Sequence, residues 1–365
     1  MKILYYFKDY DTPMYQWQHT QIIDEMSHHE CQIKIFNPLL YENPEVANEK
    51  LRIEIKKESY DLFMTVHNHR DLFISTLKDI KSMGIPTLLI CFDNLQVPFM
   101  HFKIASYFDL VWLTSKETKG LFEKRKCNTI FLPYAANPYL KRLGKTTITG
   151  IGFVGTPYGS RANIINNLTK SNIHVYCHCI KNNTSSAINY TYNSVKRSNK
   201  LFTAYQMLGF PEGRKILQGY CVNKFRKESV LINRDFLHKE TTVHPKDIYM
   251  TYEKYTLALS VNTAANTDVL KKPLSILNLR CFEIPMSGSV EFCKYVPELS
   301  EYFEEDKEII FYRNSQEIIE KAKFYLSEQY SDLRSQIGYN ARHRAEQEHT
   351  WFHRFSEIFK KLGIN

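Results

Sequence analysis

Three polar side chains interrupt an apolar run near residue 280. Residues 277–292 read LNLRCFEIPMSGSVEF, and Asn278, Arg280 and Glu283 stand there among mostly apolar neighbours. We expect a helix from Ser275 to Glu283, ended by the proline and glycine that follow. A helix with apolar residues on nearly every side is buried, and a buried carboxylate is costly unless it is paired or binds a ligand. The pattern predicts that Glu283 either accepts the ribose hydroxyls of a nucleotide or pairs with Arg280 on its own helix.

A second candidate site lies in FVGTPYGSR, residues 153–161, which reads as a strand, a tight turn and the start of a helix. Gly155 lets the backbone approach a ligand closely, and Thr156 or Ser160 can cap the helix. The free N–H groups of a helix start attract phosphate, and Arg161 would add positive charge. The stretch is not a P-loop, since no Gly-Lys-Ser/Thr follows. It predicts a phosphate site, with an ordinary α/β turn as the alternative.

Alternating strand-like and helix-like segments must position these residues. Apolar strands such as KILYYF, DLFMTV, TLLICF and DLVWL are separated by helical patterns, and the series restarts at IGFVG after the polar stretch YLKRLGKTTITG. Such alternation predicts parallel sheets. We therefore expect an α/β fold with two facing, doubly wound, Rossmann-like domains over residues 1–145 and 146–345. Two long helices, over 315–330 and 331–362, are expected to close the chain.

Candidate bases follow two strands of the first domain. Ligands of such sheets bind beyond the carboxyl ends of the strands, and Asp93 and His67 both follow apolar strand segments. Either residue can accept a proton from a substrate hydroxyl. The alternatives are a turn cap for Asp93 and a structural role for His67.

Cysteine content argues against a metal site. The eight cysteines are scattered, and their close pair, Cys177 and Cys179, has no second ligand pair at zinc spacing. We expect reduced, buried thiols and no bound metal. No apolar run reaches the ~18 residues of a membrane span, and the N-terminus is not a signal peptide. These features predict a cytoplasmic protein.

Positive charge is concentrated in one segment. Of the net charge of +9, residues 192–227 supply most, with eight Lys or Arg, one Glu and several interleaved aromatic residues. This pattern predicts contact with an anionic membrane surface, which would make the protein peripheral to the membrane, or with a phosphorylated substrate. A solvated helical face is the alternative. A nucleic-acid-binding protein is a further reading, but no nucleic-acid motif occurs, so no nucleic-acid partner is expected.

Several motifs in order resemble one family. They are FVGTPYGSR, LNLRCFEIPMSG, VPELSEYFEEDKEIIFYRN and ARHRAEQEHTW, together with GIPTLLICFDN and YFDLVWLTS in the first half. Their order is similar to that in GT-B glycosyltransferases, specifically the spore-maturation CgeB-like group. The resemblance covers most of the chain and leaves the basic segment as an insertion at about 181–243. It implies a GT-B fold whose last helix, over 346–365, crosses back to the first domain.

The resemblance also implies an activity. A hexosyltransferase-type enzyme of this family transfers sugar from a nucleotide-diphosphate sugar to a glycan, lipid-linked or protein acceptor, as in the synthesis of surface polysaccharides. The donor would bind the C-terminal domain and the acceptor the N-terminal domain. Such enzymes need no bound metal or cofactor, because helix N-termini and cations stabilise the departing diphosphate.

The resemblance carries over to four residues. Glu283 matches the second glutamate of an E-x7-E motif, which holds the donor ribose. Ser275 stands where the first glutamate, which contacts the donor sugar, would be. Arg280 would neutralise the leaving phosphate, and His244 lies in a loop expected near the nucleotide, unless it only caps a helix. Because of Ser275, a catalytically inactive protein that binds nucleotide or sugar is the alternative function.

Overall fold

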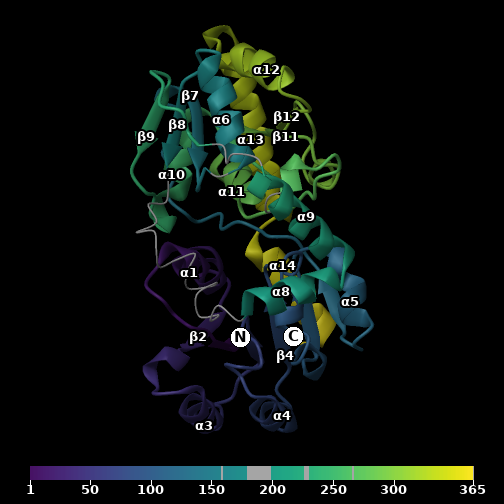
Figure 1. Ribbon diagram of the computed structural model, residues 1–365. Helices are drawn as coiled ribbons and strands as arrows, with labels where there is room; N and C mark the ends of the chain where they lie inside the picture. Colours follow the sequence, from purple (N-terminus) through teal and green to yellow (C-terminus); the bar gives the residue numbers. More distant parts are fainter. Residues whose placement is uncertain (158, 179–198, 226–229, 265–266, 365) are drawn as a thin grey trace. The chain divides into compact units, whose positions relative to one another are not determined.

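The computed structural model describes residues 1–157, 159–178, 199–225, 230–264 and 267–364. These residues form two compact units, one of residues 1–137 with 350–364 and one of residues 138–349 (Figure 1). The sequence predicted boundaries after residues 145 and 345, whereas these units divide after residues 137 and 349. Within the described ranges, no helix is long and apolar enough to cross a membrane.

The first unit is built on a parallel sheet of six strands in the order β2-β1-β3-β4-β5-β6. The strands are β1 (Lys2–Tyr6), β2 (Gln32–Phe36), β3 (Leu62–Thr65), β4 (Thr87–Cys91), β5 (Leu110–Leu113) and β6 (Thr129–Phe131). The connecting helices include α1 (Pro13–Gln18), α2 (Asp24–Ser27), α3 (Pro44–Glu54), α4 (Ile74–Ser82) and α5 (Lys119–Glu123). Strand order reverses between β1 and β3, so a ligand crevice is expected at the carboxyl ends of that pair.

The second unit contains another parallel sheet, in the order β12-β11-β10-β7-β8-β9. Its strands are β7 (Ile148–Val154), β8 (Val175–His178), β9 (Leu237–Glu240), β10 (Tyr255–Ser260), β11 (Glu291–Lys294) and β12 (Ile310–Tyr312). Its helices include α6 (Ser160–Lys170), α8 (Asn199–Leu208), α9 (Pro211–Phe225), α10 (Ile248–Glu253), α11 (Arg280–Ser287), α12 (Glu317–Leu326) and α13 (Ser331–Glu348). Here the order reverses between β7 and β10. The predicted α/β class with two doubly wound sheets is confirmed.

Helices cover both faces of the second sheet. Ile165 and Leu168 of α6 and Ile318 of α12 pack with Phe153 and Leu259 of the sheet in one buried core. Helices α10 and α11 lie on the opposite face, and α11 also packs against α13.

The backbones of α11 and α13 touch where α11 ends. Gly288 ends α11 with φ +83, a conformation that favours glycine. A Cβ built on Gly338 of α13 would lie 2.2 Å from the carbonyl oxygen of Gly288. The two glycines therefore permit a contact that fixes the end of α11 against α13.

The end of the chain forms two helices where the sequence predicted one. Helix α13 ends at Glu348, and α14 (Trp351–Leu362) begins after a break and belongs to the first unit. Thr350 explains the break, because its hydroxyl oxygen accepts the N–H of His353 and caps α14.

A buried carboxylate holds the start of α14. Glu25 of the first unit accepts the N–H groups of Trp351 and Phe352 at 3.0 and 2.8 Å. Burial raises the pKa of Glu25 to about 7, although these two hydrogen bonds oppose the shift. The positive end of the last helix thus lies against a carboxylate of the unit to which it belongs.

Candidate functional site

Gly155 and Arg280 meet at the switch point of the second sheet. Gly155 follows β7 with φ +139, in the region that favours glycine. A Cβ at this position would lie 3.4 Å from Nη1 of Arg280. The same Nη1 donates a hydrogen bond of 3.5 Å to the carbonyl of Val154. The backbone at the end of β7 and the guanidinium of Arg280 therefore lie directly against each other, as the sequence could not show.

A hydrogen-bonded group of polar side chains joins the start of α11 to the end of β10. The Asn262 side-chain oxygen accepts hydrogen bonds from Asn278 at 2.9 Å and from Ser260 at 2.8 Å. The side-chain oxygen of Asn278 in turn accepts the backbone N–H of Arg280 at 3.0 Å. This network places Arg280 beside the carboxyl end of β10.

Two hydrogen-bond donors at this edge are buried and unused. Among the described residues, Nε of Arg280 and Nδ2 of Asn262 have no hydrogen-bond partner. Leaving such a group unpaired costs about 1–3 kcal/mol. Helix α11 begins at Arg280, so the positive end of its dipole lies at the same place. The helix start and the Arg280 guanidinium would attract an anionic ligand, while Asn262 and Arg280 also act on the buried carboxyl group of Glu291.

Glu283 is buried on α11, one turn after its start. Its exposed fraction is 6 %, and its Oε2 accepts a hydrogen bond from the hydroxyl of Tyr252 at 3.5 Å. The carboxylate therefore lies close to the Arg280 group and is oriented by a tyrosine that the sequence analysis passed over.

A second buried carboxylate, Glu291, was not anticipated. It is fully buried at the start of β11, and burial raises its pKa to about 8, while Ser260, Asn262 and Arg280 oppose the shift. No hydrogen bond of normal geometry reaches either of its carboxyl oxygens from the residues the structure describes. The available signal was a charged residue between the apolar residues Val290 and Phe292. With a pKa of about 8, Glu291 is mostly protonated at neutral pH.

The predicted helix from Ser275 to Glu283 is wrong in its bounds. Residue 275 lies before α11, in an antiparallel bridge with Thr263. The backbone pairs residues 274–276 with 262–264, which prevents them from joining the helix. Pro285 lies inside α11, and Gly288 alone ends it.

The turn before α6 differs in detail from the prediction. Gly159 occupies the N-cap position of α6, so neither Thr156 nor Ser160 stands at the predicted cap position. Arg161 folds back, and its Nη1 donates to the carbonyl of Thr156 at 3.2 Å. A phosphate contact of Thr156 and Arg161 stays a prediction.

His244 fits the simpler of its two interpretations. It is exposed, and its Nδ1 accepts the backbone N–H of Lys246 at 3.2 Å, which caps a short 3-10 helix over Pro245–Asp247. Contact with a nucleotide stays a prediction.

The candidate bases of the first unit both lie beyond strands, at the carboxyl edge. The Nε2 of His67 accepts the backbone N–H of Lys8 at 2.9 Å, and its Nδ1 lies 3.5 Å from Asp71. Burial lowers the pKa of His67, and Asp71 opposes the shift. Asp93 follows β4 with its side chain exposed. Lys8 and Asp71, joined by an ion pair of 2.7 Å at the β1/β3 switch point, were missed by the sequence analysis.

The structure describes only part of the close cysteine pair and only part of the basic insertion. Cys177 is buried, whereas Cys179 and residues 180–198 and 226–229 of the insertion lie outside the described residues. Among the residues that are described, no group of three His, Cys, Asp or Glu side chains is placed to hold a metal ion.

Comparison with known proteins identifies the fold. Residues 226–360 match a family model described as "Glycosyl transferase-like". A glycosyltransferase from Rickettsia africae has a TM-score of 0.57 at 12 % identity, over 100 % of this chain and 99 % of its own. No curated protein sequence gives a significant match.

Two further solved structures share the architecture over nearly their whole length. Anabaena HepE, in complex with UDP and glucose, has a TM-score of 0.55 at 12 % identity and covers 100 % of this chain and 99 % of its own. Sucrose-phosphate synthase from Thermosynechococcus elongatus has a TM-score of 0.55 at 10 % identity, with 99 % of both chains covered. The chain therefore has the GT-B fold.

Proposed function

We propose that this protein is a metal-independent glycosyltransferase that takes a sugar from a nucleotide-diphosphate sugar. The observation that carries the proposal is the meeting of Gly155, Arg280 and the start of α11 at the switch point of the second unit. The match of residues 226–360 and the complex of HepE with UDP support it. Membership of the CgeB-like group and a hexosyl donor belong to the same proposal.

The second unit would bind the donor. Arg280 and the start of α11 would hold the diphosphate and stabilise its charge as the sugar leaves. Glu283, oriented by Tyr252, would accept the ribose hydroxyls. Gly155 would let the donor approach the end of β7, where a side chain would meet Arg280.

The first unit would supply the base for the acceptor hydroxyl. The Nε2 lone pair of His67 already accepts the N–H of Lys8, which leaves it unable to accept a proton without breaking that bond. Asp93 is accessible at the end of β4, and desolvation by the surrounding protein raises the pKa of its carboxyl group. We therefore favour Asp93 as the base and give His67 a structural role beside Asp71.

Ser275 favours a second candidate function, nucleotide or sugar binding without catalysis. It replaces a carboxylate expected to contact the donor sugar, and its backbone is held in a bridge with Thr263. In that case the donor would bind but would not be consumed. Hydrolysis or transfer of radiolabelled sugar from the bound donor separates the two functions.

Nucleotide binding is tested by thermal denaturation with UDP, GDP, ADP, dTDP and CMP. A ligand at 100 times its Kd adds about 2.7 kcal/mol of stability, which is several degrees for a chain of this size. We expect one nucleoside diphosphate, UDP by analogy with HepE, to raise the Tm while the others do not. Absence of a shift with every nucleotide would contradict the proposed function.

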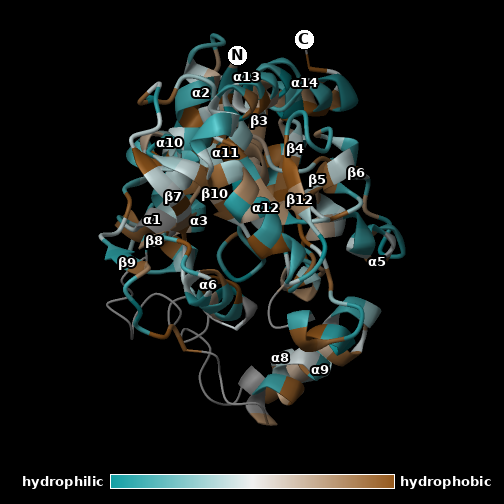
Figure 2. Cartoon of the chain, turned by 90° about the horizontal axis from the view of Figure 1, so that it is seen from above, coloured by the Kyte–Doolittle hydropathy of each residue, from teal (hydrophilic) through white to brown (hydrophobic). Residues whose placement is uncertain are grey.

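The basic insertion would bring the enzyme to an anionic membrane surface that carries a lipid-linked acceptor. Its described part is a hairpin of α8 and α9, along which Figure 2 shows hydrophobic residues. Several large apolar side chains are exposed: Leu201 (81 %), Phe202, Tyr205, Leu208, Tyr220 and Phe225 (90 %). Together with the eight basic residues of 192–227, these side chains suit an interface of acyl chains and anionic headgroups.

Vesicle sedimentation tests this contact. We expect the full chain to bind vesicles of phosphatidylglycerol and phosphatidylcholine and to bind pure phosphatidylcholine weakly. Burial of one large apolar side chain contributes about 1.5–3 kcal/mol, so Leu201→Ser with Phe202→Ser should reduce binding more than tenfold. The control, Leu40→Ser, removes an equally exposed leucine of the first unit. Equal binding by both variants would refute the contact.

A further inference from the structure

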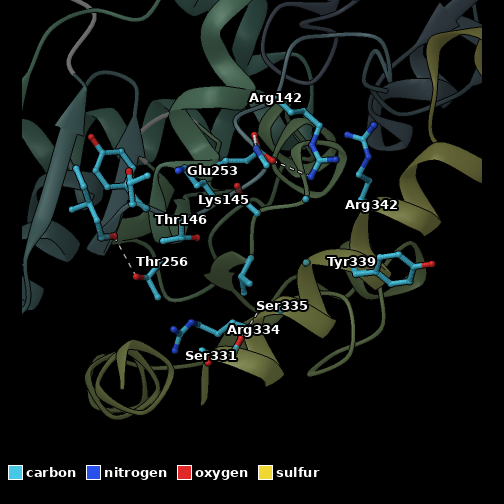
Figure 3. Close-up of a pocket in the computed structure, with 18 of the residues that line it drawn as sticks. Arg142, Lys145, Thr146, Glu253, Thr256, Ser331, Arg334, Ser335, Tyr339 and Arg342 are labelled. Carbon is cyan, nitrogen blue, oxygen red and sulfur yellow. Dashed lines mark hydrogen bonds and ion pairs between the residues drawn. The ribbon is translucent and has the colours of Figure 1, made fainter. Parts of the chain in front are cut away.

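A polar pocket lies at the amino ends of the strands of the second sheet. The proposed donor site lies at the carboxyl ends of these strands. The pocket has a volume of about 750 Å³, and its wall includes Ile148, Thr256 and Ser289, which lie near the starts of β7, β10 and β11. Figure 3 shows Thr256 in this wall. Gly155 and Asn262, by contrast, follow the carboxyl ends of β7 and β10. This volume is within the range of small-molecule sites, and the function proposed above leaves the pocket without a role.

Two arginines converge at one side of this pocket. Arg142 donates to the carbonyl of Ser287 at 2.7 Å, and Arg342 donates to the carbonyl of Met286. These carbonyl groups form the negative end of α11 and would repel an anion. The two guanidinium groups neutralise that negative end. A Cβ built on Gly288 would meet both Arg142 and Arg342, so the two side chains lie close together. Burial and the proximity of Arg142 lower the pKa of Arg342. An anion between them would relieve this repulsion.

The opposite wall is also suited to an anion. The first turn of α13 contributes Ser331, Arg334 and Ser335, so the positive end of an 18-residue helix lines the pocket (Figure 3). Lys145 adds a further cation, and among the described residues it forms no ion pair.

Acidic residues of the lining are already engaged. Glu253 forms an ion pair of 2.9 Å with Arg142 and accepts backbone N–H groups of the linker at residues 143 and 144. Glu346 pairs with Arg342 at 2.5 Å. Glu328, whose side chain is 89 % exposed, lies 3.8 Å from Arg334. Arg334 also donates to the carbonyls of Tyr325 and Ser327. Among the described residues of the lining, Lys145 is therefore the cation whose charge remains for a ligand.

Hydroxyl groups supply the rest of the wall, and one of them is unused. Ser289 is 6 % exposed, and within the described part of the chain its hydroxyl has no hydrogen-bond partner. Thr146, Thr149 and Thr256 line the same pocket. A ligand that fits this wall carries hydroxyl groups as well as negative charge.

We propose that this pocket binds a small phosphorylated polyol, such as a sugar phosphate, at a site separate from the donor site. The phosphate would lie at Lys145, on the side of the pocket where Arg142 and Arg342 converge, and the hydroxyl groups would meet Ser289 and the threonines. The proposal does not depend on the proposed transferase activity.

Isothermal titration of the full chain with glucose 6-phosphate, in saturating UDP to occupy the donor site, tests the proposal. We expect saturable binding, weakened roughly tenfold by Lys145→Glu, since a like charge opposes the phosphate. Lys170→Glu, a reversal at an exposed lysine outside the pocket, should leave the affinity unchanged. No saturable binding, or equal loss in both variants, would overturn the site.

Two further measurements define the ligand. Ser289→Ala should weaken glucose 6-phosphate binding about two- to tenfold without lowering the Tm, because the hydroxyl is unpaired in the free protein. A drop in Tm with unchanged affinity would assign Ser289 a purely structural role and remove it from the site. Inorganic phosphate should bind more weakly than glucose 6-phosphate, and equal affinities would overturn the assignment of a polyol.

Discussion

Replacing Glu283 with alanine is expected to weaken UDP binding roughly 10- to 150-fold. Hydrogen bonds to a charged group contribute about 1.5–3 kcal/mol each, and 1.4 kcal/mol corresponds to a factor of ten in Kd. The carboxylate is buried beside the start of α11 and already oriented by Tyr252, so little entropy is lost when it accepts ribose hydroxyls. Isothermal titration of the wild type and the variant measures the effect.

Matched variants distinguish binding from folding. Glu283→Gln keeps the shape but loses the charge, and should have an intermediate affinity. Tyr252→Phe removes the hydroxyl that contacts Oε2 and should weaken UDP binding by less than Glu283→Ala. If Glu283→Ala melts cooperatively and binds UDP as the wild type does, Glu283 is a structural carboxylate and the donor site must be sought elsewhere.

Replacing Glu291 with glutamine is expected to stabilise the protein at alkaline pH. The pKa of Glu291 in the folded state is about 8, against 4.5 for an ordinary glutamate. Because the folded state holds this proton more tightly, stability falls as pH rises from about 4.5 to 8. One pKa unit corresponds to about 1.36 kcal/mol, so the wild type should lose roughly 3–5 kcal/mol through this group. Glutamine, which cannot ionise, avoids that loss.

Thermal midpoints at pH 5 and pH 8.5 measure this effect. The Glu291→Gln variant should exceed the wild type by several degrees at pH 8.5 and by much less at pH 5. Glu301→Gln, at an exposed position of the same unit, should leave both midpoints unchanged. A gap between Glu291→Gln and wild type that is the same at both pH values would show that the carboxyl does not titrate in this range.

The two parallel sheets could be predicted because each strand is an apolar run between helical segments. Buried strands of parallel sheets have that pattern on both faces, and β1, β3 and β4 begin and end close to the expected residues. Gly155, Arg280 and Glu283 could be singled out because glycine after a strand and charge within an apolar run are local features. The structure brings these three residues to the carboxyl ends of the strands of the second sheet, close to the start of α11.

Features set by distant parts of the chain could not be predicted. The start of α11 was misplaced because residues 274–276 pair with 262–264, an interaction that helical periodicity does not report. The pocket at the opposite edge joins Arg142, Arg334 and Arg342, which are far apart in the sequence. The burial of Glu291 depends on α11 covering that face of the sheet.

Helix α11 connects the two edges of the second sheet. It begins at Arg280, in the proposed donor site, and ends at Ser287, whose carbonyl Arg142 covers in the polar pocket. Its eight residues span only about 12 Å, and Gly288 and Gly338 fix its end against α13. A displacement of α11 would therefore change the positions of residues in both sites. By thermodynamic linkage, any factor by which a pocket ligand changes the affinity for nucleotide must equal the factor by which nucleotide changes the affinity for that ligand.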